Sequence, residues 1–174
     1  MDLVEKLQMS EALGREFATW LYWVSFKGNG RVELPGVEPF EVWFESPVEL
    51  VNDYGEVTSV VLKGGTPLES PEALKAFSEN KKIQRTHLRV IFKNQTYTFA
   101  FHAGRFLVSG LKLPLPSGQS SSDYLLLRFE ILQEFDSFWD SVLERFFEIR
   151  FDDKKWRAQR KQISAWIRQA QVNE

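Results

Sequence analysis

The two histidines of the chain, His87 and His102, are the first residues to test for chemistry. Both fall within residues 83–103, whose alternation of apolar and polar side chains predicts two paired strands turning at Asn94-Gln95. With a two-residue turn there, the histidines lie directly opposite each other on the polar face. Such a pair could hold a metal or respond to pH. A catalytic zinc site needs three protein ligands, and no H-x-x-x-H motif or carboxylate triad lies near these histidines in the sequence. We therefore favour two solvent-facing or hydrogen-bonded histidines.

Other patterns that support catalysis are missing from the sequence. No serine sits in a G-x-S-x-G motif, and Gly28-Asn29-Gly30 fits neither a phosphate loop nor a dinucleotide fingerprint. The absence of cysteine excludes thiol catalysis and disulfides and suits a reducing compartment. We therefore expect no catalytic residue, metal or cofactor. A nuclease that uses carboxylates and a divalent ion is the enzymatic alternative.

Positive charge is concentrated at the end of the chain. Residues 150–174 hold seven basic and three acidic residues, a charge of +4, whereas the other 149 residues carry −6. A helix over about Asp153 to Val172 would separate these cations from its apolar side chains, with each set in its own sector of about 60°. The apolar sector holds Trp156, Ile163, Ile167 and Ala170, and the cationic sector holds Lys154, Arg157, Lys161 and Arg168. Such a helix can dock on the domain and offer cations to phosphates, although a solvated charged face is the simpler interpretation.

The polar face of the predicted hairpin is a second cationic candidate. Arg85, Arg89 and Lys93 share it with His87, and no acid falls among them. An open sheet face of this kind could lie against a nucleic acid backbone. The alternative is that helices cover it and acids from elsewhere pair with its cations. The hairpin aromatics fall on the opposite face, so we expect them in the core and expect any nucleic acid contact to be indifferent to sequence.

The elements that must position these residues predict one α+β domain over residues 1–174. An antiparallel sheet would pack against an amino-terminal helix and a long carboxy-terminal helix pair. The predicted helices are Glu11–Phe26 with Ser10 as cap, Pro71–Asn80, Asp123–Phe151 and Asp153–Val172. The predicted strands, besides the hairpin, are Arg31–Leu34, Phe40–Glu45, Val48–Val51, Glu56–Lys63 and Arg105–Leu115.

The long helix carries an apolar stripe with two interpretations. Leu125, Leu132, Trp139 and Phe146 recur at steps of seven, and further apolar residues widen the stripe beyond a coiled-coil seam. The stripe could be the core side of a helix that covers the sheet. It could also be half of a homodimer interface, because an open patch of this size is costly in water.

No membrane association is expected from the sequence. The first residues are acidic and lack the pattern of a signal peptide, and no window approaches 18 uninterrupted apolar residues. These features predict a cytoplasmic protein, associated with the nucleoid if it binds DNA.

Three short runs, in this order, resemble the carboxy-terminal half of some bacterial proteins of the RdgC recombination-associated family. They are Leu13-Gly14-Arg15-Glu16-Phe17 with Thr19-Trp20-Leu21-Tyr22-Trp23, Glu72-Ala73-Leu74 leading to Asn80-Lys81-Lys82-Ile83, and Leu111-Lys112-Leu113-Pro114. The similarity covers about residues 10–150, and the chain lacks the amino-terminal half of the family. The resemblance implies sequence-independent binding of DNA as a closed dimer around the duplex, limiting the access of a recombinase. It transfers no functional residue individually.

Together these features predict a non-enzymatic homodimer that binds the backbone of double-stranded DNA and modulates recombination or DNA access. The predicted contacts are Lys154, Arg157, Lys161 and Arg168, helped by Arg85, Arg89 and Lys93. The alternative is a protein-interaction module, an inhibitor or adaptor of phage or mobile-element origin, that docks through its aromatic helix or its acidic surface.

Overall fold

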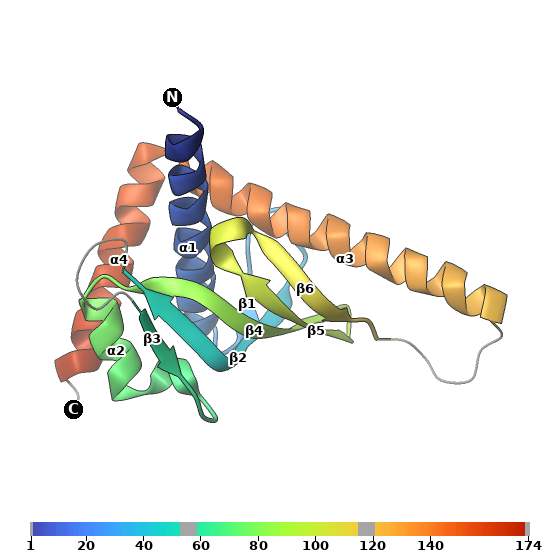
Figure 1. The fold of residues 1–174 in the computed structure, drawn as a ribbon, viewed down its shortest axis with the longest axis horizontal. Helices are drawn as coiled ribbons and strands as arrows, with labels where there is room; N and C mark the ends of the chain where they lie inside the picture. Colours follow the sequence, from blue (N-terminus) through green and yellow to red (C-terminus); the bar gives the residue numbers. More distant parts are fainter. Residues whose placement is uncertain (1, 53–58, 115–120, 173–174) are drawn as a thin grey trace.

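The protein has an α+β fold, as predicted, in which helices pack against an antiparallel sheet (Figure 1). The computed structural model describes residues 2–52, 59–114 and 121–172. The helices are α1 (Leu3–Lys27), α2 (Pro71–Ser78), α3 (Ser121–Arg150) and α4 (Asp153–Val172), with short 3-10 turns η1 (Pro67–Glu69) and η2 (Ala103–Arg105). The strands are β1 (Arg31–Val32), β2 (Phe40–Val51), β3 (Ser59–Leu62), β4 (Lys82–Phe92), β5 (Gln95–His102) and β6 (Leu107–Lys112).

The sheet is built around β2 and β4. Its order is β1-β2-β4-β5-β6, every neighbour is antiparallel, and β3 pairs with the second half of β2. The sequence predicted two strands where β2 is one, because Ser46-Pro47 looked like a break. The chain instead shifts its register against β4 between Glu45 and Glu49 and continues. Residues 56–58 of the predicted next strand lie outside the described residues.

The β4–β5 hairpin turns one residue earlier than predicted. Lys93 and Asn94 are the turn residues, with φ of 49° and 61°, and two positive φ angles are typical of a type I′ turn. Leu88 therefore pairs with Phe99 and not with the predicted Phe101. Because the pairing moves by two residues, every side chain stays on its predicted face.

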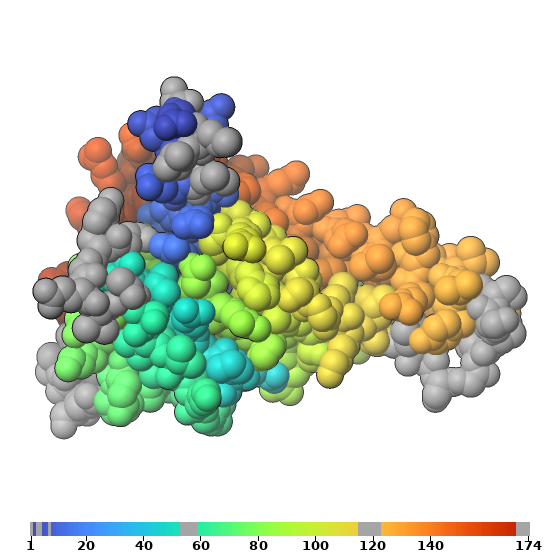
Figure 2. Space-filling view, in the orientation of Figure 1, coloured from blue at the N-terminus to red at the C-terminus, as the bar shows by residue number. Residues whose placement is uncertain are grey.

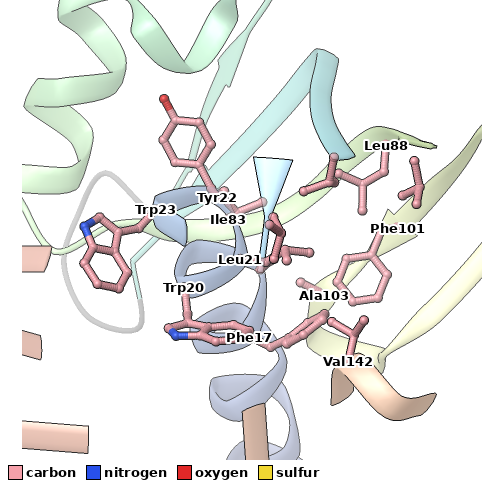
Figure 3. Packing of buried hydrophobic residues seen from close by; sticks show 14 of the residues in the cluster. Phe17, Trp20, Leu21, Tyr22, Trp23, Ile83, Leu88, Phe101, Ala103 and Val142 are labelled. Atoms are coloured by element: carbon pink, nitrogen blue, oxygen red, sulfur yellow. The ribbon is translucent and has the colours of Figure 1, made fainter. Parts of the chain in front are cut away.

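The core lies between one face of the sheet and the helices α1 and α3. Phe17 of α1 is fully buried, and its ring centroid lies 5.7 Å from that of Phe101 on β5 and 5.3 Å from that of Phe146 on α3. Farther along the sheet, the ring of Phe92 stacks on that of Phe138 of α3, with 4.2 Å between the ring centroids. Figure 3 shows this layer, with Phe17 and Leu21 of α1 turned toward Phe101 and Val142.

Local sequence explains most of the helix ends, with one exception. Ser70 caps α2 as predicted, since its Oγ accepts a hydrogen bond from the Ala73 N–H at 3.2 Å. Helix α4 has the predicted bounds. Helix α1 begins at Leu3 and not at Glu11, so the predicted cap residue Ser10 lies inside the helix. A serine can cap a helix or sit within it, and the sequence alone does not decide which.

Helix α3 extends beyond the sheet. Figure 1 shows its carboxy-terminal part against α1 and the sheet, while its amino-terminal end continues past the strands along the longest axis of the molecule. Figure 2 shows this end standing out from the body. The predicted serine-rich loop before it includes residues 115–120, which lie outside the described residues.

Candidate functional site

Helix α4 begins with a well-formed cap. The Asp152 Oδ1 accepts hydrogen bonds from the backbone N–H groups of Lys154 and Lys155, each at 3.0 Å. The bond from the Lys155 N–H is the largest cause of a pKa of Asp152 below its ordinary value. The carboxylate therefore stays charged at neutral pH and satisfies two free N–H groups of the helix.

The inner side of α4 is anchored by two tryptophans. Trp156 is buried with its ring edge-on to Phe146 of α3, at 5.9 Å between centroids. Trp166 lies 5.8 Å from Tyr22 of α1 and 5.9 Å from Phe77 of α2. Ile163 and Ile167 pack against the same core, as the helical pattern predicted. The side chain of Ala170, the fourth residue of the predicted sector, lies outside the described residues.

The outer side of α4 presents the predicted cations to solvent. We call Lys154, Arg157, Lys161 and Arg168 the α4 cation row; all four are exposed. Lys154, Arg157 and Lys161 line one shallow depression together with Asp153. Arg168 lies two turns farther along and donates from Nε to the Ser164 carbonyl at 3.1 Å. Within the described residues, ion pairing in α4 is limited to Lys155 with Asp152 at 3.4 Å. The row therefore keeps its charge available.

Two of the three predicted hairpin cations are neutralised by acids. Arg89 Nε lies 2.9 Å from Glu45 Oε1 on the neighbouring strand β2. Lys93 lies in the turn, where its Nζ is 2.7 Å from Glu134 Oε1 of α3 and 3.8 Å from Glu38 Oε2. The hydrogen bond to Glu134 is the main cause of a raised pKa of Lys93. Its charge is thus balanced, and the hairpin does not form the purely cationic face that the sequence suggested.

The turn cation Lys93 and the α4 cation row do not form one surface. The hairpin turn that holds Lys93 lies toward the end of the sheet over which α3 extends, whereas α4 lies at the other end, beside α1 and α2 (Figure 1). Arg85 is exposed on β4 and pairs in register with Glu49 of β2. The alternative prediction, that acids from elsewhere pair with these cations, is confirmed for Arg89 and Lys93. Strand β2 brings Glu45 and Glu49 to the same face as the hairpin cations. Of the two cationic candidates predicted from the sequence, the α4 cation row is the one whose residues form no ion pair within the described part of the chain.

The two histidines are not directly opposite each other, which corrects the prediction. His87 pairs with Ala100, and His102 pairs with Arg85. The His87 Nδ1–H donates to the Ser46 carbonyl at 3.2 Å, and His102 Nε2 is 3.1 Å from the Ser109 hydroxyl. Over residues 2–52, 59–114 and 121–172, no group of three or more histidine or carboxylate side chains could hold a metal ion.

The predicted interface stripe on α3 is divided between core and solvent. Trp139 and Phe146 are buried in the core, which confirms the core interpretation for these two residues and excludes them from a dimer interface. Leu132 is half-buried, and Leu125 is exposed. The division arises because only the carboxy-terminal part of α3 lies over the sheet.

Sequence reasoning missed the neighbours of Leu125. Leu125, Leu126 and Phe129, which we call the apolar tip of α3, are 65%, 66% and 59% exposed. Leu126 and Phe129 fall outside the seven-residue stripe. Apolar residues on several sides of one helix turn could have predicted this exposed patch, because a single buried face needs them on one side only. The tip lies on the part of α3 that extends beyond the sheet (Figure 2).

Comparisons with protein families, with characterised proteins and with solved structures found no match to this chain. The resemblance to RdgC-type proteins therefore stays a prediction. Among the described residues, no helix is both long enough and apolar enough to cross a membrane.

Proposed function

We propose that this protein binds the phosphate backbone of double-stranded DNA through the α4 cation row, without catalysing a reaction. The observation that carries the proposal is the row itself: four exposed cations on one side of a helix, none paired with a carboxylate among the described residues. Residues 154–172 of this helix contain no acid. Cations so placed neutralise phosphates and release the counterions condensed on DNA.

The same geometry supports contact without sequence preference. The hairpin aromatics Tyr97, Phe99 and Phe101 are buried, so they are not available to stack on bases. Lysine and arginine that contact phosphates fix position and do not read sequence. The acidic remainder of the chain would restrict binding to the α4 side, because like charges repel DNA elsewhere.

Fluorescence anisotropy with two duplexes of unrelated sequence tests the proposal. If four phosphates are neutralised, log K falls against log salt with a slope of about −3.6 for both duplexes. The double variant Lys161→Glu/Arg168→Glu weakens binding to both equally. Lys63→Glu/Lys112→Glu is the matched control, since both lysines are exposed on strands or loops and the change in net charge is the same.

Two results would contradict the proposal. One is affinity that does not change with salt, since phosphate contacts require a salt dependence. The other is equal loss of affinity in the control variant, which would assign the effect to net charge alone.

The second candidate function is protein interaction through the apolar tip of α3. Three large apolar side chains that are together and more than half exposed are unusual on a protein that acts alone. A homodimer is the simplest arrangement, because a two-fold axis would cover both tips at once. Sedimentation velocity of the wild type and of Leu125→Ser/Leu126→Ser/Phe129→Ser tests it, with a dimer expected only for the wild type.

If the wild type is a monomer at a protein concentration of about 100 μM, the homodimer is overturned. A functional homodimer has a dissociation constant well below that concentration. The apolar tip would then bind a different protein, as an adaptor does. Capture of partner proteins from host lysate in the presence of nuclease tests this, because nuclease removes proteins that are held only through DNA. Proteins that the wild type still captures after nuclease treatment, and that the triple variant does not capture, support the adaptor function.

A further inference from the structure

A pocket of about 200 Å³ lies beneath α4, where this helix crosses α1, the end of α2 and the start of β4. We call it the α4 pocket. Its apolar wall includes Trp20, Trp156 and Ile163, and its polar wall includes Glu16, Lys82 and Arg160. None of these residues belongs to the α4 cation row. The pocket is therefore a separate site from the proposed DNA surface.

Trp20, a residue of the pocket wall, carries a hydrogen-bond donor that no group in the described part of the chain satisfies. Trp20 is 1% exposed, and its Nε1 has no hydrogen-bond partner among the described residues. Figure 3 shows the indole nitrogen at the end of the ring turned away from Phe17. A buried indole N–H usually finds an acceptor, and an unpaired one in a pocket wall is suited to an acceptor atom of a ligand.

Basic side chains outnumber acidic ones in the lining of the pocket, which holds Lys81, Lys82, Arg160 and one acid, Glu16. Glu16 pairs with Arg150 and lies 3.8 Å from Lys82, and Lys81, only 4% exposed, pairs with Glu79. Arg160 forms no ion pair with any described residue. The charge of Arg160 therefore favours an anion in the pocket.

We propose that the α4 pocket binds a small molecule that joins one anionic group to a flat apolar body. The anionic group, a carboxylate or a phosphate, would accept from Trp20 Nε1 and from the Arg160 guanidinium. The apolar body would lie against Trp156 and Ile163. The volume is below the roughly 300 Å³ at which ordinary ligand pockets begin, so a single aromatic ring fits better than a nucleotide.

An occupant of this pocket touches two parts of the molecule at once. Trp20 and Lys82 belong to α1 and β4, while Trp156 and Arg160 belong to α4. Binding would therefore favour the docked position of α4, because a ligand that binds only the docked arrangement stabilises it. This proposal does not depend on DNA binding. If the α4 cation row does bind DNA, the ligand could regulate the position of that row.

Nitrogen–proton correlation spectra of the full chain test the proposal. The indole N–H signals of the six tryptophans are resolved from the backbone amide signals. The signal that disappears in Trp20→Phe is the Trp20 signal. Benzoate and phenyl phosphate are the probes, and benzamide is the uncharged control. We expect the Trp20 signal to move and saturate with the two anions but not with benzamide.

Two variants of α4 make the test specific. Arg160→Ala should weaken anion binding about tenfold or more, because it removes a charge-assisted hydrogen bond. Lys155→Ala removes an exposed cation of the same helix that does not line the pocket, and it should leave the affinity for both anions unchanged. A Trp20 signal that stays unmoved up to about 10 mM of both anions would overturn the proposal, since affinities weaker than this are not specific. Equal affinity in the Arg160 and Lys155 variants would overturn it as well.

Discussion

Arg89 Nε of β4 lies 2.9 Å from Glu45 Oε1 of β2 on the solvent side of the sheet, and both side chains are nearly half exposed. The pair shows why the cations of the hairpin do not act as a group. Strand β2 supplies the carboxylate, from Glu45 opposite His87, to a cation that the hairpin sequence left unpaired. The sheet face is therefore mixed in charge, and DNA binding in our proposal depends on α4.

Arg89→Ala should change little. An exposed ion pair contributes only about 0–1 kcal/mol, because water screens it and two side chains lose freedom to form it. We expect the free energy of unfolding in urea to fall by less than about 1 kcal/mol. DNA affinity in anisotropy should match the wild type. A loss of affinity as large as that of Lys161→Glu/Arg168→Glu would show that the sheet face takes part in binding.

Gly14→Ala should destabilise the protein although alanine is the better helix former. A Cβ at Gly14 would stand 1.7 Å from the Ala103 carbonyl oxygen of η2, so α1 or η2 must move. We expect a loss of about 1–3 kcal/mol in urea unfolding, the usual cost of overpacking. Gly65→Ala is the control, because nothing lies within 4 Å of its Cβ position. Equal stability of the two variants would mean that α1 and η2 are farther apart than described.

The two ends of α3 should differ in their effect on stability. Phe146→Ala removes a fully buried ring and should cost about 3–5 kcal/mol. Leu125→Ala and Phe129→Ala, at the exposed apolar tip, should each change the free energy of unfolding by about 0.5 kcal/mol or less when measured on the monomer. A large loss from Leu125→Ala at low protein concentration would place the tip in the core of the monomer.

Stability should fall as the pH drops through the range of histidine. Burial, and next the charge of Arg85, hold the pKa of His102 below its ordinary value; Arg105 and His87 act in the same direction and Glu49 opposes them. The folded state therefore disfavours protonation. The contribution of His102 is fully present above its unfolded pKa of about 6.5 and is lost as the pH falls from there through the folded value.

Urea unfolding at about pH 7.5 and about pH 5.5 measures this effect, because carboxylates with lowered pKa values, such as Asp152 and Glu79, titrate below that interval. The free energy of unfolding should decrease between the two conditions, and His102→Gln should decrease less. A variant with the same decrease as the wild type would assign the pH dependence to other groups.

Patterns within single elements were predicted well. The bounds of α4, the cap of α2 by Ser70 and the sorting of β4 and β5 into two faces all follow from residues close together in the chain. The site was predicted less well. The α4 cation row is exposed as expected, whereas Arg89 and Lys93 of the hairpin pair with acids, and the α4 pocket around Trp20 was not foreseen.

The sequence by itself determined which side chains share a face, because the periods of helix and strand fix the direction of each residue relative to its neighbours. Only the tertiary structure decided what each face meets. It placed Glu45 beside Arg89, Trp139 in the core and Leu125 in solvent. These outcomes depend on which elements pack together, and that choice is made by contacts between residues far apart in the chain, for which local periodicity carries no information.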